Sequence, residues 1–253
     1  EGITLKLMKE ILDFRECIFL LDKLPSYYKN LNTDFSNDFN YKNDNGNIKY
    51  PKKDILIVKD IPRYLNVKQQ ILPKNIKVFN LEQYSGFMIG FKEVESIDAY
   101  LKVRFGNSSR YKLRRSIKKL ETSFNISYKM YYGDISKQDY DFIFEEFFKL
   151  LYTRSIEKGI SNNFQIKRKN FYYELVYPLI LKRKASFFVI FNGKNPIDVC
   201  LNFHNKNFVY QLIRTYDINY SKFNTGYIDL IKQIEWCVDN KISFINFSYG
   251  DYY

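Results

Sequence analysis

The C-terminal part of the sequence carries an alternating apolar pattern that constrains the fold more than any other feature. Three apolar segments follow one another with short polar turns between them, and a helix-like segment and a last apolar segment come next. Val199, Leu201 and Phe203 occupy alternate positions, as in a strand that packs through one face. The five segments span residues 186–191, 197–203, 208–214, 226–240 and 242–247. This order predicts a three-strand meander, a loop, an amphipathic helix and a final parallel strand.

The preceding residues predict a mixture of helices and strands. Apolar periodicity favours helices at residues 4–23, 64–71, 97–101, 110–121, 137–157 and 169–182. Short apolar runs favour strands at residues 55–58, 76–81, 87–91 and 126–130. Ser96 can cap the helix at 97–101, and Ser108 or Ser109 can cap the next one. The segment 32–50 is rich in Asn and Asp and predicts a loop.

The predicted helix at residues 110–121 is strongly basic. Leu113, Ile117 and Leu120 fall at positions i, i+4 and i+7, which predicts a buried stripe. Residues 101–120 contain no Asp or Glu. The helix therefore presents either a solvated basic face or a surface that contacts phosphate groups.

The size and charge of the chain narrow the classes of function. Its 253 residues suffice for one large domain or two small ones, and 45% of them are hydrophobic, as in a globular protein. The formal net charge is +12. This charge favours nucleic acid, an anionic membrane surface or a phosphate-rich cofactor as a partner, unless it belongs to a solvated Lys-rich surface.

The cysteine and histidine content argues against metal and disulfide frameworks. Cys17, Cys200 and Cys237 lie far apart in apolar surroundings, and His204 is the single histidine. We expect no metal site, a core position for Cys200 and Cys237, and a turn at His204. No signal peptide or membrane span is recognisable, so we predict a cytoplasmic protein. The first residue, Glu1, is compatible with a fragment of a longer chain.

The loop before the C-terminal helix is a candidate phosphate site. It consists of Ser221, Lys222, Phe223, Asn224, Thr225 and Gly226. A helix start presents unpaired backbone N–H groups and a partial positive charge, which suit a pyrophosphate. Gly226 allows the backbone to approach closely, Asn224 tolerates a positive φ, and Lys222 adds charge. The same residues also fit an ordinary helix start, because many helices begin with Thr-Gly.

Four segments, taken in their order, resemble the GNAT superfamily of acyltransferases. They are residues 100–121 with the basic helix, 187–217 with the meander, 223–242 with the Thr-Gly helix start, and 244–253 with a strand that ends in Gly-Asp-Tyr. They are most similar to the branch of acetyltransferases associated with cellulose biosynthesis and to its Fem-type relatives, which use aminoacyl-tRNA. Of the six loop residues, only Gly226 matches the usual coenzyme A loop of the superfamily.

The resemblance implies an α/β (mixed α+β) GNAT fold, in which helices flank a central mixed, mostly antiparallel sheet. The chain is then either a single GNAT unit with an N-terminal addition or a tandem of two GNAT-like units. We place the boundary near residue 122. Residues 1–122, with the basic helix, form the N-terminal domain, which is a degenerate GNAT-like unit if the chain is a tandem. Residues 123–253 form the acyltransferase domain.

The resemblance also implies direct transfer between two substrates. In this fold the parallel strands at residues 208–214 and 242–247 splay apart, and the gap exposes backbone groups that hold the pantetheine and polarise the thioester carbonyl. The amine must lose its proton before it attacks, so a carboxylate or a chain of water molecules is needed nearby. Proximity of donor and amine and stabilisation of the oxyanion supply much of the acceleration.

Three residues are candidates for the chemical step. Asp217 follows the third strand and is either a base or a turn-capping carboxylate. Asp251 follows the last strand and either orients the amine or forms an Asx-type turn. Tyr252 is a candidate acid for the leaving thiolate, although the chain contains 23 Tyr residues and most of them must be structural.

We therefore predict an N-acyltransferase, most simply an acetyltransferase, that moves an acyl group from acyl-coenzyme A to a small-molecule amine without a metal. The candidate donor-binding residues are the loop at 221–226 together with Arg110 and Arg114 of the basic helix. Two alternatives remain open. The charge of +12 favours a Fem-type transferase that uses aminoacyl-tRNA, and basic residues interleaved with aromatic ones favour a non-catalytic nucleic-acid-binding module.

Overall fold

The computed structural model describes residues 9–34, 36–43, 55–72, 74–82, 85–91, 93–160 and 164–247. Contacts divide the chain into two compact units. The small unit comprises Glu1–Phe87, Asn205–Asn207 and Tyr249–Tyr253, and the large unit comprises Met88–His204 and Phe208–Ser248. The main division falls at Met88. The domain boundary near residue 122 stays a prediction. Independent folding of residues 1–122 stays a prediction.

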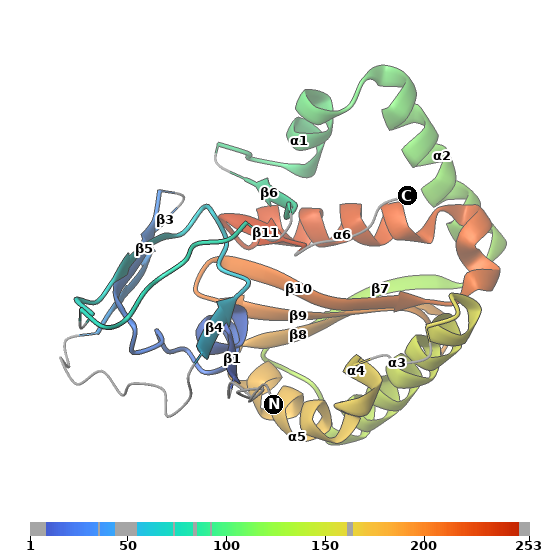
Figure 1. The fold of residues 1–253 in the computed structure, drawn as a ribbon. Helices are drawn as coiled ribbons and strands as arrows, with labels where there is room; N and C mark the ends of the chain where they lie inside the picture. Colours follow the sequence, from blue (N-terminus) through green and yellow to red (C-terminus); the bar gives the residue numbers. More distant parts are fainter. Residues whose placement is uncertain are drawn as a thin grey trace. The chain divides into compact units, whose positions relative to one another are not determined.

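A six-stranded mixed sheet forms the centre of the large unit (Figure 1). Its strands lie in the order β6 (Met88–Gly90), β11 (Phe244–Asn246), β10 (Phe208–Tyr216), β9 (Asn195–Asn205), β8 (Ala185–Asn192) and β7 (Ile126–Tyr131). β7 pairs with β8 and β8 with β9 in antiparallel orientation. β10 pairs with β11 in parallel, and β11 pairs with β6 in antiparallel orientation. The predicted mixed, mostly antiparallel sheet is confirmed.

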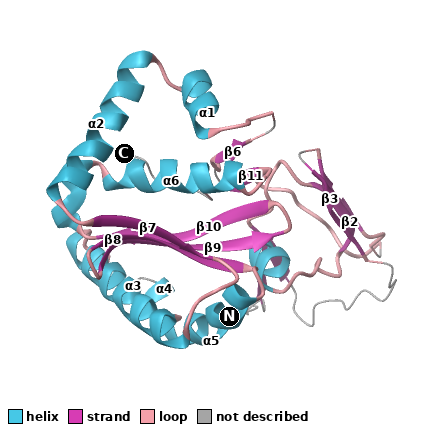
Figure 2. Ribbon diagram, turned by 180° about the vertical axis from the view of Figure 1, so that it is seen from behind, coloured by secondary structure: helices cyan, strands magenta, loops and turns pink. Residues whose placement is uncertain are grey.

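Helices cover both faces of this sheet (Figures 1 and 2). Helix α6 (Thr225–Asp239) lies on one face, and α1 (Ile97–Arg104) and α2 (Asn107–Ser123) pack beside it. The other face carries α3 (Lys137–Glu157), α4 (Phe164–Lys167) and α5 (Lys169–Leu181). A short 3₁₀ helix, η2 (Ile218–Phe223), joins β10 to α6. The arrangement confirms the predicted α/β fold with flanking helices.

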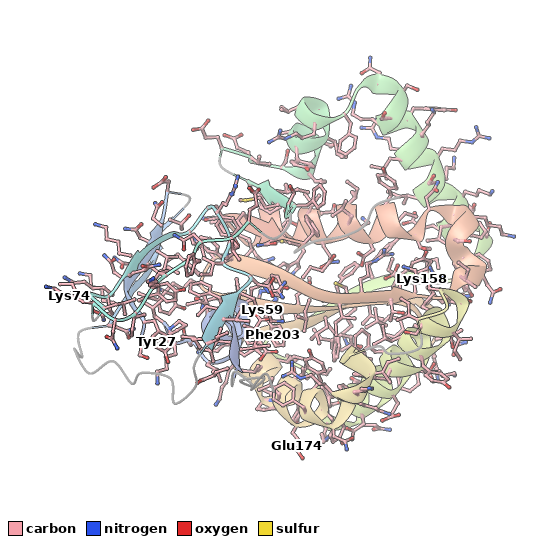
Figure 3. All side chains as sticks on the ribbon, in the orientation of Figure 1. Tyr27, Lys59, Lys74, Lys158, Glu174 and Phe203 are labelled. Atoms are coloured by element: carbon pink, nitrogen blue, oxygen red, sulfur yellow. The ribbon has the colours of Figure 1, made fainter. Side chains whose placement is uncertain are left out.

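Aromatic side chains fill the layer between the sheet and α3. Phe144 and Phe147 of α3 and Phe187 of β8 are fully buried, and the rings of Phe147 and Phe187 lie 5.7 Å apart. Phe203 of β9, labelled in Figure 3, is also buried, whereas Glu174 on the outside of α5 is exposed. Burial of such large apolar surfaces is the main favourable contribution to folding.

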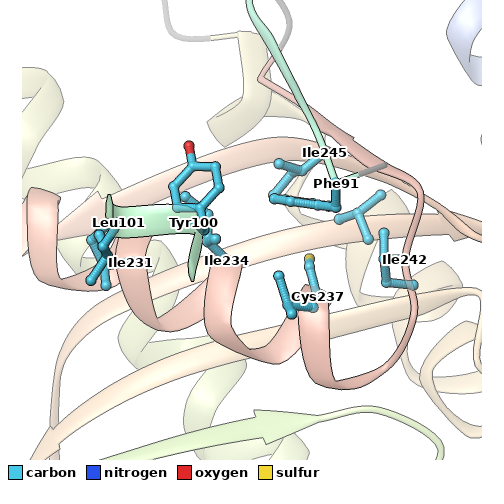
Figure 4. Packing of buried hydrophobic residues seen from close by; sticks show 10 residues of the cluster. Phe91, Tyr100, Leu101, Ile231, Ile234, Cys237, Ile242 and Ile245 are labelled. Carbon is cyan, nitrogen blue, oxygen red and sulfur yellow. The ribbon is translucent and has the colours of Figure 1, made fainter. Parts of the chain in front are cut away.

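Two apolar clusters lie on the other side of the sheet, beneath α6. The first joins α6 to β11 and α1 and includes Tyr100, Leu101, Ile231, Ile234, Cys237 and Ile245 (Figure 4). The second joins α2 to the sheet and includes Leu120, Phe188, Ile190, Cys200, Phe223 and Ile228. Leu120 is fully buried, and Leu113 and Ile117 are partly buried, so the predicted stripe of the basic helix is confirmed. The core positions predicted for Cys200 and Cys237 are confirmed as well.

Local capping explains where the helices on this side begin. The Ser96 hydroxyl oxygen accepts the backbone N–H of Ala99 at 3.2 Å, so α1 begins where the sequence predicts. The next prediction is wrong, because α2 already begins at Asn107 and has no side-chain cap. Ser108 and Ser109 lie inside its first turn.

The small unit contains two separate small sheets. In one, β1 (Lys9–Asp13) pairs in parallel with β4 (Ile55–Lys59). In the other, β2 (Tyr28–Thr33) lies between β3 (Ser36–Lys42) and β5 (Asn66–Gln69). A π-helix, η1 (Glu16–Leu20), comes soon after β1. The interpretation of this part as a degenerate GNAT-like unit stays a prediction.

Several predictions for the small unit are wrong. The described part of the helix predicted at 4–23 contains β1 and η1, and the helix predicted at 64–71 is replaced by β5. The loop predicted at 32–50 contains β3, and residues 76–81 form no strand. These strands are short and partly polar, so pairing with a neighbour decides their structure more than their own propensity does.

Candidate functional site

The end of β10 and the start of α6 form the candidate site. Among the described residues, the parallel ladder pairs Phe208 with Phe244, Val209 with Ile245 and Tyr210 with Asn246. β10 continues to Tyr216, and the described part of the chain ends at Phe247, directly after β11. The splay of parallel strands that the resemblance implies stays a prediction.

The side-chain alternation of β10 reverses within this stretch. Val209 belongs to the cluster beneath α6, and Arg214 contacts Asp229 of α6, so both side chains lie on the same face of the sheet. Their residue numbers differ by five, and in a regular strand an odd difference places two side chains on opposite faces. An irregularity of the bulge type therefore lies between them, and bulges release backbone groups from a ladder beside binding sites.

The predicted phosphate loop forms a tight helical turn. Asn224 is left-handed, with φ 60° and ψ 39°, and its N–H donates to the carbonyl of Ser221 at 3.0 Å. The Asn224 carbonyl accepts the N–H of Ile228 at 3.1 Å. Thr225 and Gly226 open α6, so their N–H groups precede any acceptor within the helix. A helix N-terminus thus follows β10 closely, as predicted.

The six loop residues divide between the core and the surface. Phe223 and Thr225 are buried, Gly226 is partly buried, and Ser221, Lys222 and Asn224 are exposed. Phe223 packs against Phe124 in the second apolar cluster. The hydroxyl of Thr225 is buried and has no hydrogen-bond partner within the described residues. The loop therefore offers its backbone and Lys222 rather than its whole length.

A buried ionic cluster lies directly behind the start of α6. The guanidinium of Arg214 on β10 contacts both carboxylate oxygens of Asp198 on β9, at 3.2 Å for the Nε contact. The same Nε lies 3.0 Å from Asp229 Oδ2 on α6. Asp198 and Asp229 are 0% and 1% exposed, whereas the Arg214 side chain is 21% exposed. Arg214 therefore joins two strands and the first turns of α6, and one edge of it reaches solvent.

The electrostatics of this cluster follow from its burial. Burial raises the pKa of Asp198 well above its ordinary value, with opposition from Arg214 and support from Asp229. Burial also raises the pKa of Asp229, and Arg214 and Gln233 oppose the rise. Burial disfavours the Arg214 cation, but the two carboxylates outweigh this effect and raise its pKa. Arg214 therefore stays charged, and its charge holds the two acidic side chains in place.

Gly226 lies close to the guanidinium of Arg214. A Cβ atom added to Gly226 would lie 3.1 Å from Arg214 Nη1, closer than ordinary van der Waals contact. The space beside this glycine is therefore filled by a guanidinium group of the protein itself. The close approach that the sequence predicts at Gly226 is an approach of Arg214, which brings a cation to the start of α6.

A chain of buried hydrogen bonds extends from this cluster beneath α6. Gln233 Nε2 donates to Asp229 Oδ2 at 2.9 Å, and Asn202 Nδ2 donates to Gln233 Oε1 at 2.9 Å. Asn202 also lies 3.4 Å from the Ser186 hydroxyl, which is 2.7 Å from His204 Nε2. All of these side chains are buried, so each bond satisfies a group that water does not reach.

His204 lies in strand β9, so the predicted turn at this residue is wrong. The ring is 2% exposed and packs against Tyr132 and Trp236. Burial lowers the pKa of His204 to about 3, so the imidazole is neutral at physiological pH. A serine lies beside it, but both groups are buried, and this excludes nucleophilic attack on a substrate in the present conformation.

The structure places the other predicted residues as follows. Asp217 caps η2, because its Oδ1 accepts the backbone N–H of Asn219 at 2.9 Å. Arg114 pairs with Asp98 of α1 at 3.6 Å, and Arg110 contacts Asn107 within α2. Neither arginine is in contact with the loop at 221–226 through an interaction seen in the structure. Asp251 and Tyr252 lie outside the described residues.

The residues that sequence reasoning missed are Asp198, Arg214 and Asp229. Each is a charged residue within an apolar element, and that interruption is the signal that could have identified them. Asp229 and Gln233 also stand at i and i+4, on the buried side of α6.

Within the described ranges, no group of three or more His, Cys, Asp or Glu side chains is placed to hold a metal ion. Over the same ranges, every helix is too short or too polar to traverse a lipid bilayer.

Comparison with known proteins identifies the class. The N-terminus of α6, which follows β10 and η2, suits an anionic group such as a phosphate. Residues 107–253 match the family model of the acetyltransferase (GNAT) domain. This match covers more than half of the chain, and the protein belongs to the GNAT acetyltransferase domain family. The family indicates acyltransferase activity.

Solved structures add little to this assignment. One similar structure is the crystal structure of a conserved protein of unknown function from Bacteroides thetaiotaomicron, which is 8% identical, with a TM-score of 0.42. The similarity covers 65% of this chain and 50% of that protein, so the chain spans half of its length. No curated protein matches the sequence.

Proposed function

We propose that the protein is an N-acyltransferase that moves an acyl group, most simply acetyl, from acyl-coenzyme A to the amine of a small molecule. The observation that carries this proposal is the start of α6, which follows β10 and η2 and has the Arg214 guanidinium beside Gly226. Family membership supports the reaction class. A cytoplasmic location agrees with the use of coenzyme A thioesters and stays a prediction.

The chain offers separate groups for the two ends of the donor. The N–H groups of Thr225 and Gly226, together with the partial charge of α6, suit the pyrophosphate. Arg214 adds a cation at this point, because its Nη1 lies beside Gly226. The edge of β10 beyond Tyr210 is our proposed partner for the pantetheine, whose amides need backbone groups.

The chemical step in this proposal is a single displacement. The amine nitrogen attacks the thioester carbonyl carbon, the C–N bond forms, and the C–S bond breaks. The thiolate of coenzyme A leaves and takes up a proton, and the nitrogen loses one to water or a base. Released N–H groups of β10 can stabilise the oxyanion while the bonds change.

The base and the acid remain proposals. Asp217 lies directly after β10 and is only partly buried, but it caps η2, so it favours a structural role. Asp251 and Tyr252 stay our proposed groups for orienting the amine and protonating the thiolate.

The experiment is thermal melting of the protein with acetyl-coenzyme A, longer acyl-coenzyme A species and free coenzyme A. A ligand that binds only the native state raises the melting temperature once its concentration exceeds its dissociation constant. We expect an increase with the thioesters, and a release of free thiol that depends on an added amine. An absence of binding by every thioester would overturn the proposal.

A second candidate donor is aminoacyl-tRNA, favoured by the basic surface of α1 and α2. Residues 99–120 contain eight Lys or Arg and no Asp or Glu, and most of the basic side chains are exposed. Salt-sensitive binding of aminoacyl-tRNA, without any effect of coenzyme A compounds on melting, would favour this donor.

A further inference from the structure

Two lysine side chains converge on one aromatic ring beside the start of α6. Lys119 Nζ of α2 lies 5.2 Å from the ring centroid of Phe223, and Lys222 Nζ of η2 lies 5.4 Å from it. Both lysines are exposed, whereas Phe223 is 4% exposed. The ring attracts both cations, and it fixes where their side chains run.

These two cations differ from three other lysines that lie over aromatic rings in the large unit. Lys137, Lys169 and Lys232 each pair with a carboxylate, whereas Lys129, which lies over Tyr131, forms no ion pair within the described residues either. Within the described residues, neither Lys119 nor Lys222 forms an ion pair. Both cations therefore lie near one ring without a carboxylate to neutralise them, and a bound anion would supply the missing counter-charge.

Helix α2 is held against the loop that leads into α6. Asn224 Nδ2 donates to Ser116 Oγ of α2 at 3.1 Å, and Leu120 of α2 belongs to the same buried cluster as Phe223. This attachment brings Lys119 next to the helix start, although about a hundred residues separate it from the loop in the sequence. The lysine pair therefore flanks the group of backbone N–H donors that suits the donor pyrophosphate.

We propose that Lys119 and Lys222 bind the ribose 3′-phosphate of the acyl donor, and so make the protein selective for coenzyme A over dephospho-coenzyme A. This inference rests on the proposed acyl-coenzyme A function. A phosphate monoester carries about −1.5 to −2 charges at neutral pH, which two ammonium groups match. Lysine suits this task because its ammonium group binds phosphate as a point charge from several directions.

The test compares the binding of coenzyme A and 3′-dephospho-coenzyme A to the full chain by calorimetric titration. Each ammonium group would form a charge-assisted contact with the 3′-phosphate, so we expect the wild type to bind coenzyme A at least about tenfold more tightly. Lys119→Gln and Lys222→Gln should each weaken coenzyme A binding by about tenfold and leave dephospho-coenzyme A binding unchanged. Lys118→Gln is the matched control, because Lys118 is exposed on the same helix and does not contact Phe223.

The outcomes separate this inference from the proposed function. Equal binding of both compounds by the wild type would overturn the inference and leave the acyltransferase proposal intact. If the Gln variants lost affinity for both compounds equally, the inference would also be overturned, because the lysines would then contact the pyrophosphate. If neither compound binds, the proposed function falls and the inference falls with it. Adenosine 3′,5′-bisphosphate and adenosine 5′-monophosphate repeat the comparison without the pantetheine arm.

Discussion

The two faces of the central sheet are buried equally well and in opposite ways. On the α3 side, Phe144, Phe147 and Phe187 form an aromatic layer. On the α6 side, Ser186 of β8 and Asp198 of β9 are also 0% exposed, and they accompany two apolar clusters. The α3 side is therefore closed by aromatic packing, whereas the α6 side combines apolar packing with a buried polar network.

The energetics of the two faces differ accordingly. Burial of aromatic side chains contributes favourable free energy roughly in proportion to the apolar area removed from water. Burial of an ion pair often contributes nothing, because the loss of hydration exceeds the mutual attraction. The cluster of Arg214, Asp198 and Asp229 is therefore poorly explained by stability alone. Its position behind the start of α6 favours a role in holding the donor site in shape.

The largest difference between the two sides of the sheet should appear when Arg214, the cation of the buried polar network, is removed. Arg214→Met leaves two buried carboxylates without a counter-charge, and we expect a loss of about 5 kcal/mol in the free energy of unfolding near neutral pH. Arg115→Met is the matched control, because Arg115 is exposed on α2, and we expect a loss below about 0.5 kcal/mol. Chemical denaturation of both variants measures the difference.

The pH dependence of Arg214→Met provides a separate test. Arg214 lowers the pKa of both carboxyls, so its removal raises the pKa of Asp198 and Asp229 further. Groups whose folded-state pKa is raised stabilise the protein below their unfolded pKa, and that stability is lost as the pH rises. The deficit of the variant should therefore be small near pH ~4 and grow towards pH ~7. If the loss of stability in Arg214→Met were constant over this pH range, Arg214 would not be the counter-charge of the two carboxylates.

The apolar face should respond to truncation by a comparable loss without any pH dependence. Phe147 is fully buried against Phe187 and Phe148, so Phe147→Ala should cost about 4 kcal/mol. Phe142→Ala on the exposed side of the same helix is the control, because Phe142 is 45% exposed, and it should cost less than about 1 kcal/mol. Equal losses in the two variants, measured by denaturant melts at two pH values, would contradict the aromatic-layer interpretation.

The same contrast explains how much the sequence could predict. Alternation located β8, β9 and the helix after β10, and α3 has the predicted bounds, because these segments carry strong apolar periods. Alternation also assigns Asp198 to solvent, since Val199 and Leu201 beside it point inward. That assignment fails because helices cover both faces of the sheet, and only the packing of distant elements reveals a buried charge.

Helix α6 shows the same limit in another form. The aromatic Tyr227 is 62% exposed, whereas the acidic Asp229 is 1% exposed. A helical period gives the spacing of the buried stripe but not its exact angular position, and the partner Arg214 shifts the stripe towards Asp229. The sequence also could not predict that Lys119 and Lys222 lie beside the same ring, because this depends on the packing of α2 against η2.

Within the polar face, the hydrogen-bond chain should be less costly to interrupt than the ion cluster. Ser186→Ala removes the partner of His204 Nε2, and His204 Nδ1 already has no partner within the described residues. A buried ring without any hydrogen bond should cost about 2 kcal/mol in the free energy of unfolding. Ser96→Ala serves as a comparison for the loss of a surface hydroxyl that caps a helix, which should cost about 1 kcal/mol. A smaller loss in Ser186→Ala than in Ser96→Ala would show that the buried hydrogen-bond chain contributes little to the free energy of unfolding.

The smallest expected effect tests the contact between the two parts of the donor site. Gly226→Ala improves helix propensity by up to about 1 kcal/mol, but it also places a methyl group 3.1 Å from Arg214 Nη1. Arg214 is held by two carboxylates and yields only by lengthening those contacts, so overpacking should outweigh the gain and leave a net loss of about 1 kcal/mol. Gly90→Ala is the control, since nothing lies within 4 Å of its added Cβ atom. Donor binding, followed by the thermal shift with acetyl-coenzyme A, should weaken in Gly226→Ala and not in Gly90→Ala, because only the first moves the cation at the start of α6. A stabilised Gly226→Ala variant would mean that Arg214 is free to move, and the polar face would then be a pliable surface rather than a fixed support.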